Sequence, residues 1–316
     1  MEKMAVLTSG GDAPGMNSAI HAVCLRCENL NIELVGVIGG FKGLYEGDYV
    51  KLTSNMTSQS ASLGGTILKS SRFIEFKQTE YVKKAIDKAK EANIEGIIVI
   101  GGDGSYLGAL ALSNLGMPTI GIPGTIDNDI SGTQFTIGFD SALNTIVSSI
   151  DQFKDTLRSH GRCLLVEVMG RHCKDLAVYG AMSGNVDAVI TSKSEVEDDY
   201  LTELIIESIK RKDECIIVIS ENVLNVYELA KHLQDLSNIE CRGCVLGYLQ
   251  RGGHPTARDR LLATRCGLYA VDALNEGCNG KCTCLKDELI QLQSIEEALS
   301  INYHDSYIYE EYKKLR

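Results

Sequence analysis

The sequence has few prolines, no long apolar run and no excess of positive charge, and each shortage argues against a class of protein. Only four prolines stand beside 31 glycines in 316 residues, so neither a collagen-like repeat nor a proline-rich linker is present. No apolar run approaches the length that crosses a bilayer. Lys and Arg number 31 against 42 Asp and Glu, and a net charge of −11 argues against a generic nucleic-acid binder. With 44% hydrophobic residues, the composition predicts a globular protein.

The apolar run near the N-terminus, residues 4–7, is too short for a signal peptide, so we expect a cytoplasmic protein. The eleven cysteines are therefore expected as thiols and not as disulfides. Two Cys-x-x-Cys pairs, Cys24 with Cys27 and Cys241 with Cys244, have the spacing of half a zinc site. Neither has a histidine at ligand spacing, so buried small side chains are the favoured interpretation.

Short apolar segments alternate with amphipathic ones. The apolar segments predict strands at residues 5–7, 34–38, 97–100, 119–122, 163–168, 188–190, 216–219 and 244–246. Apolar residues spaced by three and four predict helices at 81–92 and 198–212. This alternation predicts an α/β fold with mostly parallel sheets. The length predicts two domains, and the lack of a linker suggests that the chain crosses between them more than once.

Glycine-rich turns follow three of the predicted strands. The first places Gly10 and Gly11 before a helix, which either brings backbone N–H groups to an anion or makes a tight turn. The second surrounds Asp103 with glycines, where its carboxylate could hold Mg²⁺ against a phosphate or cap the next helix. The third carries Asp127 and Asp129, and Asp127 is a candidate base toward a hydroxyl, with an Asx turn as the alternative. Parallel sheets bind ligands at this end of their strands.

Several arginines stand beside glycines or at predicted strand ends: Arg72, Arg162, Arg171, Arg242 and Arg251. Any one of them could form a surface salt bridge. In a net-negative protein, however, a phosphorylated substrate needs local positive charge, and the planar guanidinium binds phosphate through two hydrogen bonds. As a set, these arginines predict recognition of two phosphate groups.

Five motifs, in this order, resemble the bacterial type of the 6-phosphofructokinase family. They are Thr-Ser-Gly-Gly-Asp-Ala-Pro-Gly-Met-Asn at 8–17, Gly-Gly-Asp-Gly-Ser at 101–105, Pro-Gly-Thr-Ile-Asp-Asn-Asp at 123–129, Val-Met-Gly-Arg at 168–171 and Leu-Gln-Arg-Gly-Gly at 249–253. The resemblance extends to about residue 275. It implies two three-layer Rossmann-like α/β domains that face each other across a cleft. Residues 1–138 with about 250–300 would bind the nucleotide, and 139–249 with about 301–316 the sugar phosphate.

The resemblance also implies a reaction: transfer of the γ-phosphoryl of ATP, with Mg²⁺ as cofactor, to the 1-hydroxyl of fructose 6-phosphate. Asp127 would be the base, Thr125, Arg171 and Gly11 would lie near the transferred group, and Asp103 would hold Mg²⁺. ATP would contact Gly11, Arg72, Phe73, Gly102, Asp103, Gly104 and Ser105. The sugar phosphate would contact Thr125, Ile126, Asp127, Arg162, Met169, Gly170, Arg171, Glu221, Arg242, Tyr248, Leu249, Gln250 and Arg251. In the family, Arg162 and Arg242 reach a neighbouring subunit's site, so a homotetramer with shared sites is implied.

Three positions bear on substrate choice. Relatives that use pyrophosphate typically carry an acidic residue and a lysine where this chain has Gly104 and Gly124, so the resemblance favours ATP. Tyr248 stands where the family usually has histidine, which keeps a related ketose phosphate open as the acceptor. A non-catalytic regulatory subunit that binds the same metabolites is the other alternative. A pure binder, however, would need no base such as Asp127.

The family's effector pocket departs furthest from the pattern. The candidate positions here are His21, Lys154 and Lys212, of which only the two lysines stay reliably cationic. Asp213 and Glu214 place negative charge at further positions of the pocket. We therefore expect a weak or altered response to ADP and phosphoenolpyruvate. No nucleic-acid or membrane partner is expected.

Overall fold

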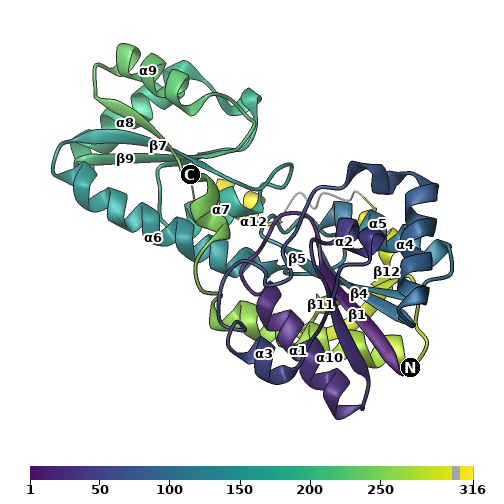
Figure 1. The fold of residues 1–316 in the computed structure, drawn as a ribbon. Helices are drawn as coiled ribbons and strands as arrows, with labels where there is room; N and C mark the ends of the chain where they lie inside the picture. Colours follow the sequence, from purple (N-terminus) through teal and green to yellow (C-terminus); the bar gives the residue numbers. More distant parts are fainter. Residues whose placement is uncertain (301–306, 316) are drawn as a thin grey trace. The chain divides into compact units, whose positions relative to one another are not determined.

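The chain folds into two α/β units, shown in Figure 1. The structure is a computed structural model that describes residues 1–300 and 307–315. Unit 1 comprises Met1–Ser141 and Arg251–Asn302, and unit 2 comprises Ala142–Gln250 and Tyr303–Arg316. The chain therefore leaves unit 1 after Ser141 and returns to it after Gln250. The last crossing expected from the sequence, near residue 301, falls outside the described residues. No helix in the described ranges is long and apolar enough to span a membrane.

Unit 1 is built on a sheet of eight strands within the described residues. In order across the sheet these are β12 (Leu289–Ser294), β11 (Lys281–Lys286), β5 (Thr119–Thr125), β4 (Gly96–Gly101), β1 (Lys3–Thr8), β2 (Glu33–Val37) and β3 (Tyr49–Lys51), with β6 (Ile137–Gly138) paired to β5. All pairings are parallel except those of the edge strands β12 and β3. The central strand β4 is buried on both faces, as a parallel strand between two helix layers must be.

Helices cover both faces of this sheet. Helix α1 (Met16–Asn29) packs against α10 (Ala257–Asn275) on one face, with α3 (Ser54–Ser58) beside α1. The other face carries α2 (Phe41–Glu46), α4 (Thr79–Glu91), α5 (Asp103–Asn114), α11 (Ile295–Leu299) and the short helix η1 (Ile74–Lys77). Alternate residues of β1 serve the two layers, since Ala5 and Leu7 belong to the α4–α5 side.

Unit 2 has a parallel sheet whose described strands follow the order β10 (Cys241–Val245), β7 (Arg162–Val168), β9 (Glu214–Ser220) and β8 (Ala188–Ile190). One core lies between this sheet and the helices α8 (Asp198–Lys212) and α9 (Val226–Ser237). Helix α7 (Asp175–Ser183) packs on β8 and β9 and, through Gly180, against α6 (Phe139–Arg158). The remaining elements are η2 (Lys193–Glu195), η3 (Gly247–Arg251) and α12 (Tyr307–Lys313).

The expected fold class, α/β with mostly parallel sheets, is confirmed. The predicted bounds are reproduced for β8 and α8. The strand expected at 244–246 instead spans Cys241–Val245, because β10 is an edge strand that pairs only with β7 and is partly exposed. No disulfide joins any of the eleven cysteines, all of which lie in the described part of the chain, and eight of them are buried.

Candidate active site

The three glycine-rich turns of unit 1 contact one another. The backbone N–H of Ser9 donates to the carbonyl oxygen of Ile100 at 3.0 Å, which joins the first turn to β4. A Cβ on Gly101 would lie 2.6 Å from the carbonyl oxygen of Ser9, and one on Gly102 would lie 3.4 Å from the Cβ of Thr125. Only glycine permits so close an approach at position 101. The turns after β1, β4 and β5 thus form one site.

The third turn holds Thr125 and Asp127 in a fixed geometry. The Asp127 N–H donates to the Thr125 hydroxyl at 3.2 Å, and the Asp127 side chain is 5% exposed. Ile126 is buried, so only its backbone is available to a ligand. The Thr136 hydroxyl donates to the carbonyl oxygen of Thr125 at 2.7 Å, and the Thr136 N–H donates to Oδ1 of Asn128 at 3.0 Å. Sequence reasoning missed this support from Thr136, which comes from outside the motif.

Asp103 opens helix α5 and is exposed. Beside it, a Cβ on Gly104 would meet no atom within 4 Å, so the space next to the carboxylate is open. In the described ranges no group of three His, Cys, Asp or Glu side chains could hold a metal ion. A single carboxylate beside an open glycine suits Mg²⁺, which usually takes one or two carboxylates and fills its remaining positions with water and phosphate oxygens. Ser105 is buried and lies against Gly10 and Gly101.

Arg251 lies over the first turn. A Cβ on Gly11 would be 3.2 Å from the guanidinium carbon of Arg251, so a side chain there would displace the arginine. Gly10, directly before Gly11, is constrained in its backbone, because its φ of 82° lies in the left-handed region that favours glycine. The structure thus brings together two residues that the sequence assigned to ATP and to the sugar phosphate.

Arg72 and Phe73 also lie at the first turn. The Ser70 hydroxyl donates to the carbonyl oxygen of Gly10 at 2.6 Å and ties their segment to it. The Phe73 ring packs against Tyr45, with ring centroids 5.4 Å apart. Arg72 is exposed. The bond from Ser70 thus holds the segment that carries Arg72 and Phe73 beside Gly10, and their contact with a nucleotide stays a prediction.

In unit 2, one carboxylate holds two of the predicted phosphate-binding arginines. Arg162 Nε lies 2.7 Å from Oε2 of Glu240, and Arg242 Nε donates to Oε1 of Glu240 at 2.9 Å. The hydrogen bonds from Arg242 and the charge of Arg162 lower the pKa of Glu240. Sequence reasoning missed Glu240. Its position before β10, which pairs in parallel with β7, is the signal that could have found it.

The loop of Met169, Gly170 and Arg171 is held by two side chains from elsewhere in unit 2. Oε1 of Glu221 accepts hydrogen bonds from the N–H groups of Gly170 at 3.1 Å and of Arg171 at 2.6 Å. Oε1 of the buried Gln250 accepts from the Met169 N–H at 3.0 Å. Both were assigned to the sugar phosphate. Here each binds the backbone of the loop that carries Arg171.

Two consecutive residues at the start of the last motif and just before it, Leu249 and Tyr248, are exposed. Tyr248 is 81% and Leu249 66% exposed, whereas Gln250 between them and Arg251 is fully buried. Tyr248, Leu249 and Gln250 all lie on η3, where three residues make one turn and successive side chains therefore point in different directions. Tyr248 and Leu249 are therefore accessible to a ligand or to another chain.

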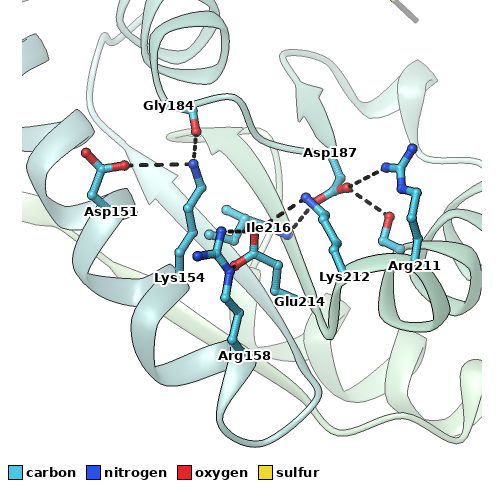
Figure 2. Close-up of polar contacts among 10 residues, drawn as sticks. Asp151, Lys154, Arg158, Gly184, Asp187, Arg211, Lys212, Glu214 and Ile216 are labelled. Atoms are coloured by element: carbon cyan, nitrogen blue, oxygen red, sulfur yellow. Dashed lines mark hydrogen bonds and ion pairs between the residues drawn. The ribbon is translucent and has the colours of Figure 1, made fainter.

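Figure 2 shows the polar cluster around Lys154 and Lys212 in unit 2. Nζ of Lys212 lies 3.1 Å from Oδ2 of Asp187 and 3.6 Å from Oε1 of Glu214, two carboxylates that are almost fully buried. Nζ of Lys154 donates to the carbonyl oxygen of Gly184 and lies 3.8 Å from Asp151.

Further polar contacts reach the same two carboxylates. Nε of Arg158 lies 3.0 Å from Oε2 of Glu214, and Nη2 of Arg211 lies 3.9 Å from Oδ1 of Asp187. The Ser208 hydroxyl and the Ile216 N–H also donate to Asp187, at 2.8 and 2.9 Å. The cationic side chains of this cluster are thus already engaged by the protein's own oxygens. Sequence reasoning identified the lysines but missed Asp187.

His21 belongs to α1 of unit 1, whereas Lys154 and Lys212 belong to unit 2. Its Nδ1 is 2.8 Å from the Thr57 hydroxyl, and burial lowers its pKa below the usual value. At neutral pH the ring is therefore uncharged. The three residues that the sequence assigned to one effector pocket are therefore divided between the two units of the chain.

The chain is similar to known proteins over nearly its whole length. Residues 3–274 match the family model described as phosphofructokinase. The chain is 46% identical over 302 residues to the ATP-dependent 6-phosphofructokinase 1 of Clostridium perfringens, covering 95% of each chain. It is 46% identical to the ATP-dependent 6-phosphofructokinase of Vibrio parahaemolyticus, covering 94% of this chain and 93% of the relative. The phosphofructokinase structure from Saccharomyces cerevisiae superposes with a TM-score of 0.88 at 29% identity, covering 99% of this chain and 47% of that one, so this chain spans about half of its length. The chain belongs to the phosphofructokinase family.

Proposed function

We propose that this chain is an ATP-dependent 6-phosphofructokinase, which transfers the γ-phosphoryl of ATP to the 1-hydroxyl of fructose 6-phosphate. The products are fructose 1,6-bisphosphate and ADP. The contact between the three glycine-rich turns is the observation that carries the proposal. It gathers backbone N–H groups, Asp103 and Asp127 at the ends of β1, β4 and β5. Phosphoryl transfer needs positioning and charge neutralisation at one such place.

In this mechanism Asp127 takes the proton of the sugar 1-hydroxyl. The Thr125 hydroxyl orients the backbone of Asp127 through the hydrogen bond described above. Arg171 and the backbone of Gly11 stabilise charge on the transferred group. Asp103 would hold Mg²⁺, which when bound neutralises phosphate charge. The open space at Gly104 supports ATP as donor, because a larger residue there would take up room beside Asp103.

Gly124 is weaker evidence for ATP as the phosphoryl donor than Gly104 is. A Cβ on Gly124 would lie 2.9 Å from Cγ2 of Ile100, so packing alone requires glycine at this position. Preference for ATP over pyrophosphate therefore rests on Gly104. A side chain at Gly104 would be accommodated sterically, whereas one at Gly124 would press on the Ile100 side chain of β4.

The sugar phosphate is assigned to the arginines and loops of unit 2. Arg162 and Arg242 share Glu240, and both side chains are partly exposed, Arg242 on the edge strand β10 and Arg162 at the start of β7. This position supports their reaching the site of a neighbouring subunit in a homotetramer. We also propose that the enzyme acts in the cytoplasm.

The effector response is proposed to be weak. Lys154 and Lys212 are bound to oxygens of their own unit, and the carboxylates of Asp187 and Glu214 would repel an incoming anion. A sigmoidal dependence on fructose 6-phosphate that ADP abolishes would contradict this part of the proposal.

The test measures ADP release from MgATP with and without fructose 6-phosphate, beside a reaction with pyrophosphate as donor. A sugar-dependent rate with ATP alone supports the proposal. Asp127→Ser should lower kcat by roughly 10²–10⁴-fold, the usual contribution of a general base. An unchanged kcat would remove Asp127 from that role. No turnover with either donor would favour another ketose phosphate or a regulatory subunit.

A further inference from the structure

A buried aspartate, Asp259, joins the start of helix α10 to the start of helix α6. Its side chain is 1% exposed, and its Oδ2 accepts hydrogen bonds from the Ser141 N–H at 2.8 Å and the Ser141 hydroxyl at 2.6 Å. The Gly138 N–H also donates to this carboxylate. Burying a carboxylate is costly unless donors compensate it, and all of these donors come from residues 138–141.

Asp259 is not needed to cap its own helix. The N-cap of α10 is Thr256, whose hydroxyl accepts from the Asp259 N–H at 3.3 Å. The Thr256 N–H donates to the Ser141 hydroxyl at 3.0 Å, and the Thr256 hydroxyl donates to Oδ2 of Asp140 at 2.6 Å. The two helix starts therefore satisfy each other's end groups. The Asp259 side chain therefore accepts hydrogen bonds from the first turn of α6 and not from its own helix.

The segment that Asp259 holds is continuous with the support of the catalytic turn. Strand β6 lies directly before α6 and pairs with the end of β5, Gly138 lying opposite Thr125. Gly138 has a φ of 106°, and a Cβ there would lie 2.7 Å from the Cβ of Ala13. A displacement of Gly138 would therefore move Thr125 on one side and press on the first turn on the other.

Asp259 also lies directly behind that first turn. A Cβ on Gly15, the N-cap residue of α1, would be 3.7 Å from the Cβ of Asp259 and 2.6 Å from Cγ2 of Ile137. The first turn, β6 and the start of α10 thus meet at this point. Burial, together with the charge of Asp140, raises the pKa of Asp259 to about 6, so the side chain is mostly ionised at neutral pH and accepts all of these bonds.

We propose that Asp259 is a positioning residue for phosphoryl transfer: it fixes residues 138–141 so that β6 holds Thr125 and Asp127 against the first turn. It does not touch the substrates. Its effect is on the geometry of the reacting groups, where a displacement of about 1 Å can lower the rate by about 10²-fold. The inference rests on the proposed kinase function.

The test compares Asp259→Ala with Asp259→Asn in the full-length protein. The asparagine can keep a carbonyl oxygen where both bonds from Ser141 arrive, whereas alanine removes it. We expect Asp259→Ala to lower kcat by about 10–100-fold with the KM values for ATP and fructose 6-phosphate within about threefold. Asp259→Asn should recover most of kcat. In hydrogen exchange, residues 124–138 should exchange faster in Asp259→Ala.

Thr53→Ala is the matched control. It removes the cap of α3, also in unit 1, through the loss of one bond from the Met56 N–H at 3.4 Å. It should lower stability without changing kcat or exchange in residues 124–138. An unchanged kcat in folded Asp259→Ala would overturn the inference.

If Asp259→Ala does not fold, Ser141→Ala takes its place, because it removes the hydroxyl donor and keeps the N–H donor. An unchanged kcat in Ser141→Ala would then overturn the inference. The wild-type rate separates the two proposals. If the wild type shows no sugar-dependent ADP release, the proposed function is wrong. If the wild type is active and the variant has the same kcat, only the proposed role of Asp259 is wrong.

Discussion

Glu221 accepts hydrogen bonds from two consecutive backbone N–H groups, those of Gly170 and Arg171, through a single oxygen. Arg171 has a φ of 53°, in the left-handed region that a residue with a side chain rarely adopts, and Gly170 has a φ of 141°, which glycine tolerates. The carboxylate therefore stabilises a strained loop. Its link to the sugar phosphate would pass through Arg171.

Glu221→Gln should behave nearly like the wild type, because the amide oxygen can accept the same two hydrogen bonds. Glu221→Ala removes the acceptor and should lower kcat/KM for fructose 6-phosphate by roughly 10–100-fold, which corresponds to the loss of hydrogen bonds to a charged group. Steady-state kinetics with both variants decides the matter. Equal losses of kcat/KM in Glu221→Gln and Glu221→Ala would show that the negative charge itself is required.

Asp259 predicts a pH dependence of stability. Its folded pKa of about 6 lies above the ordinary value of 3.8, so between these pH values the folded protein holds a proton that the unfolded chain has released. The free energy of unfolding contributed by this group therefore falls as the pH rises from about 4 to about 6. Asp259→Asn lacks this loss and should gain on the order of 2 kcal/mol relative to the wild type between pH 4.5 and pH 7.5.

Urea unfolding of both proteins at pH 4.5 and pH 7.5 measures this difference. The charged neighbour that acts on Asp259 is Asp140, and it is present in both proteins. Curves that stay parallel with pH would show that Asp259 does not change its protonation in this range.

At the scale of elements, the cysteine thiols fall into two groups, those buried inside helices and strands and those that are partly exposed. Burial raises the pKa of Cys27, Cys266 and Cys282 to about 12, whereas Cys173 and Cys278 are only half-buried. Because the thiolate is the reactive form, iodoacetamide at pH 8 should label Cys173 and Cys278 in the native protein and the other three only after unfolding. Peptide mass spectrometry reads this directly. Native labelling of Cys282 would contradict the burial of β11.

The same elements show how far the sequence could predict the fold. Strands with continuous β-branched runs, such as β4 and β9, were found because both faces are buried. Strands β11 and β12 were missed: β11 carries Cys282, Thr283 and Cys284 where an apolar run was expected, and β12 is half-exposed. Strand β6 has two residues and no sequence pattern of its own.

The candidate site was predictable only where motifs were local. Gly10, Asp103 and Asp127 stand in turns that the sequence displays. Asp259 and Ser141 are 118 residues apart, and their hydrogen bond exists only because α6 and α10 begin beside each other. Contacts between residues so far apart in the sequence depend on how the strands and helices are arranged, which no local sequence pattern predicts.

At the scale of the whole molecule, the cluster in Figure 2 makes the stability of unit 2 depend on buried charge. Asp187→Asn leaves Lys212 with a weaker partner and should lower the free energy of unfolding by about 3 kcal/mol, the usual result of removing one partner of a buried ion pair. Asp213→Asn, the same change at an exposed neighbouring position, is the control and should have little effect.

Urea unfolding of the two variants tests this, with hydrogen exchange assigning the loss to a unit. Faster exchange should be confined to β9 and its neighbours in unit 2, because Asp187 bonds to Ser208 and Ile216 there. Equal stability of Asp187→Asn and the wild type would show that the buried pair contributes no net stabilisation.

The sheet order of unit 1 has a consequence for the growing chain on the ribosome. Strand β11 pairs with β5, yet 155 residues separate the end of β5 from the start of β11, and unit 2 accounts for most of them. At about 5–20 residues per second, translation takes roughly 10–30 s to supply that partner. During this interval the nascent sheet has an open edge at β5 while the inserted unit emerges. A chaperone bound to the nascent chain, or fast folding of the inserted unit, would protect that edge. Slow codons after residue 141 would lengthen its exposure.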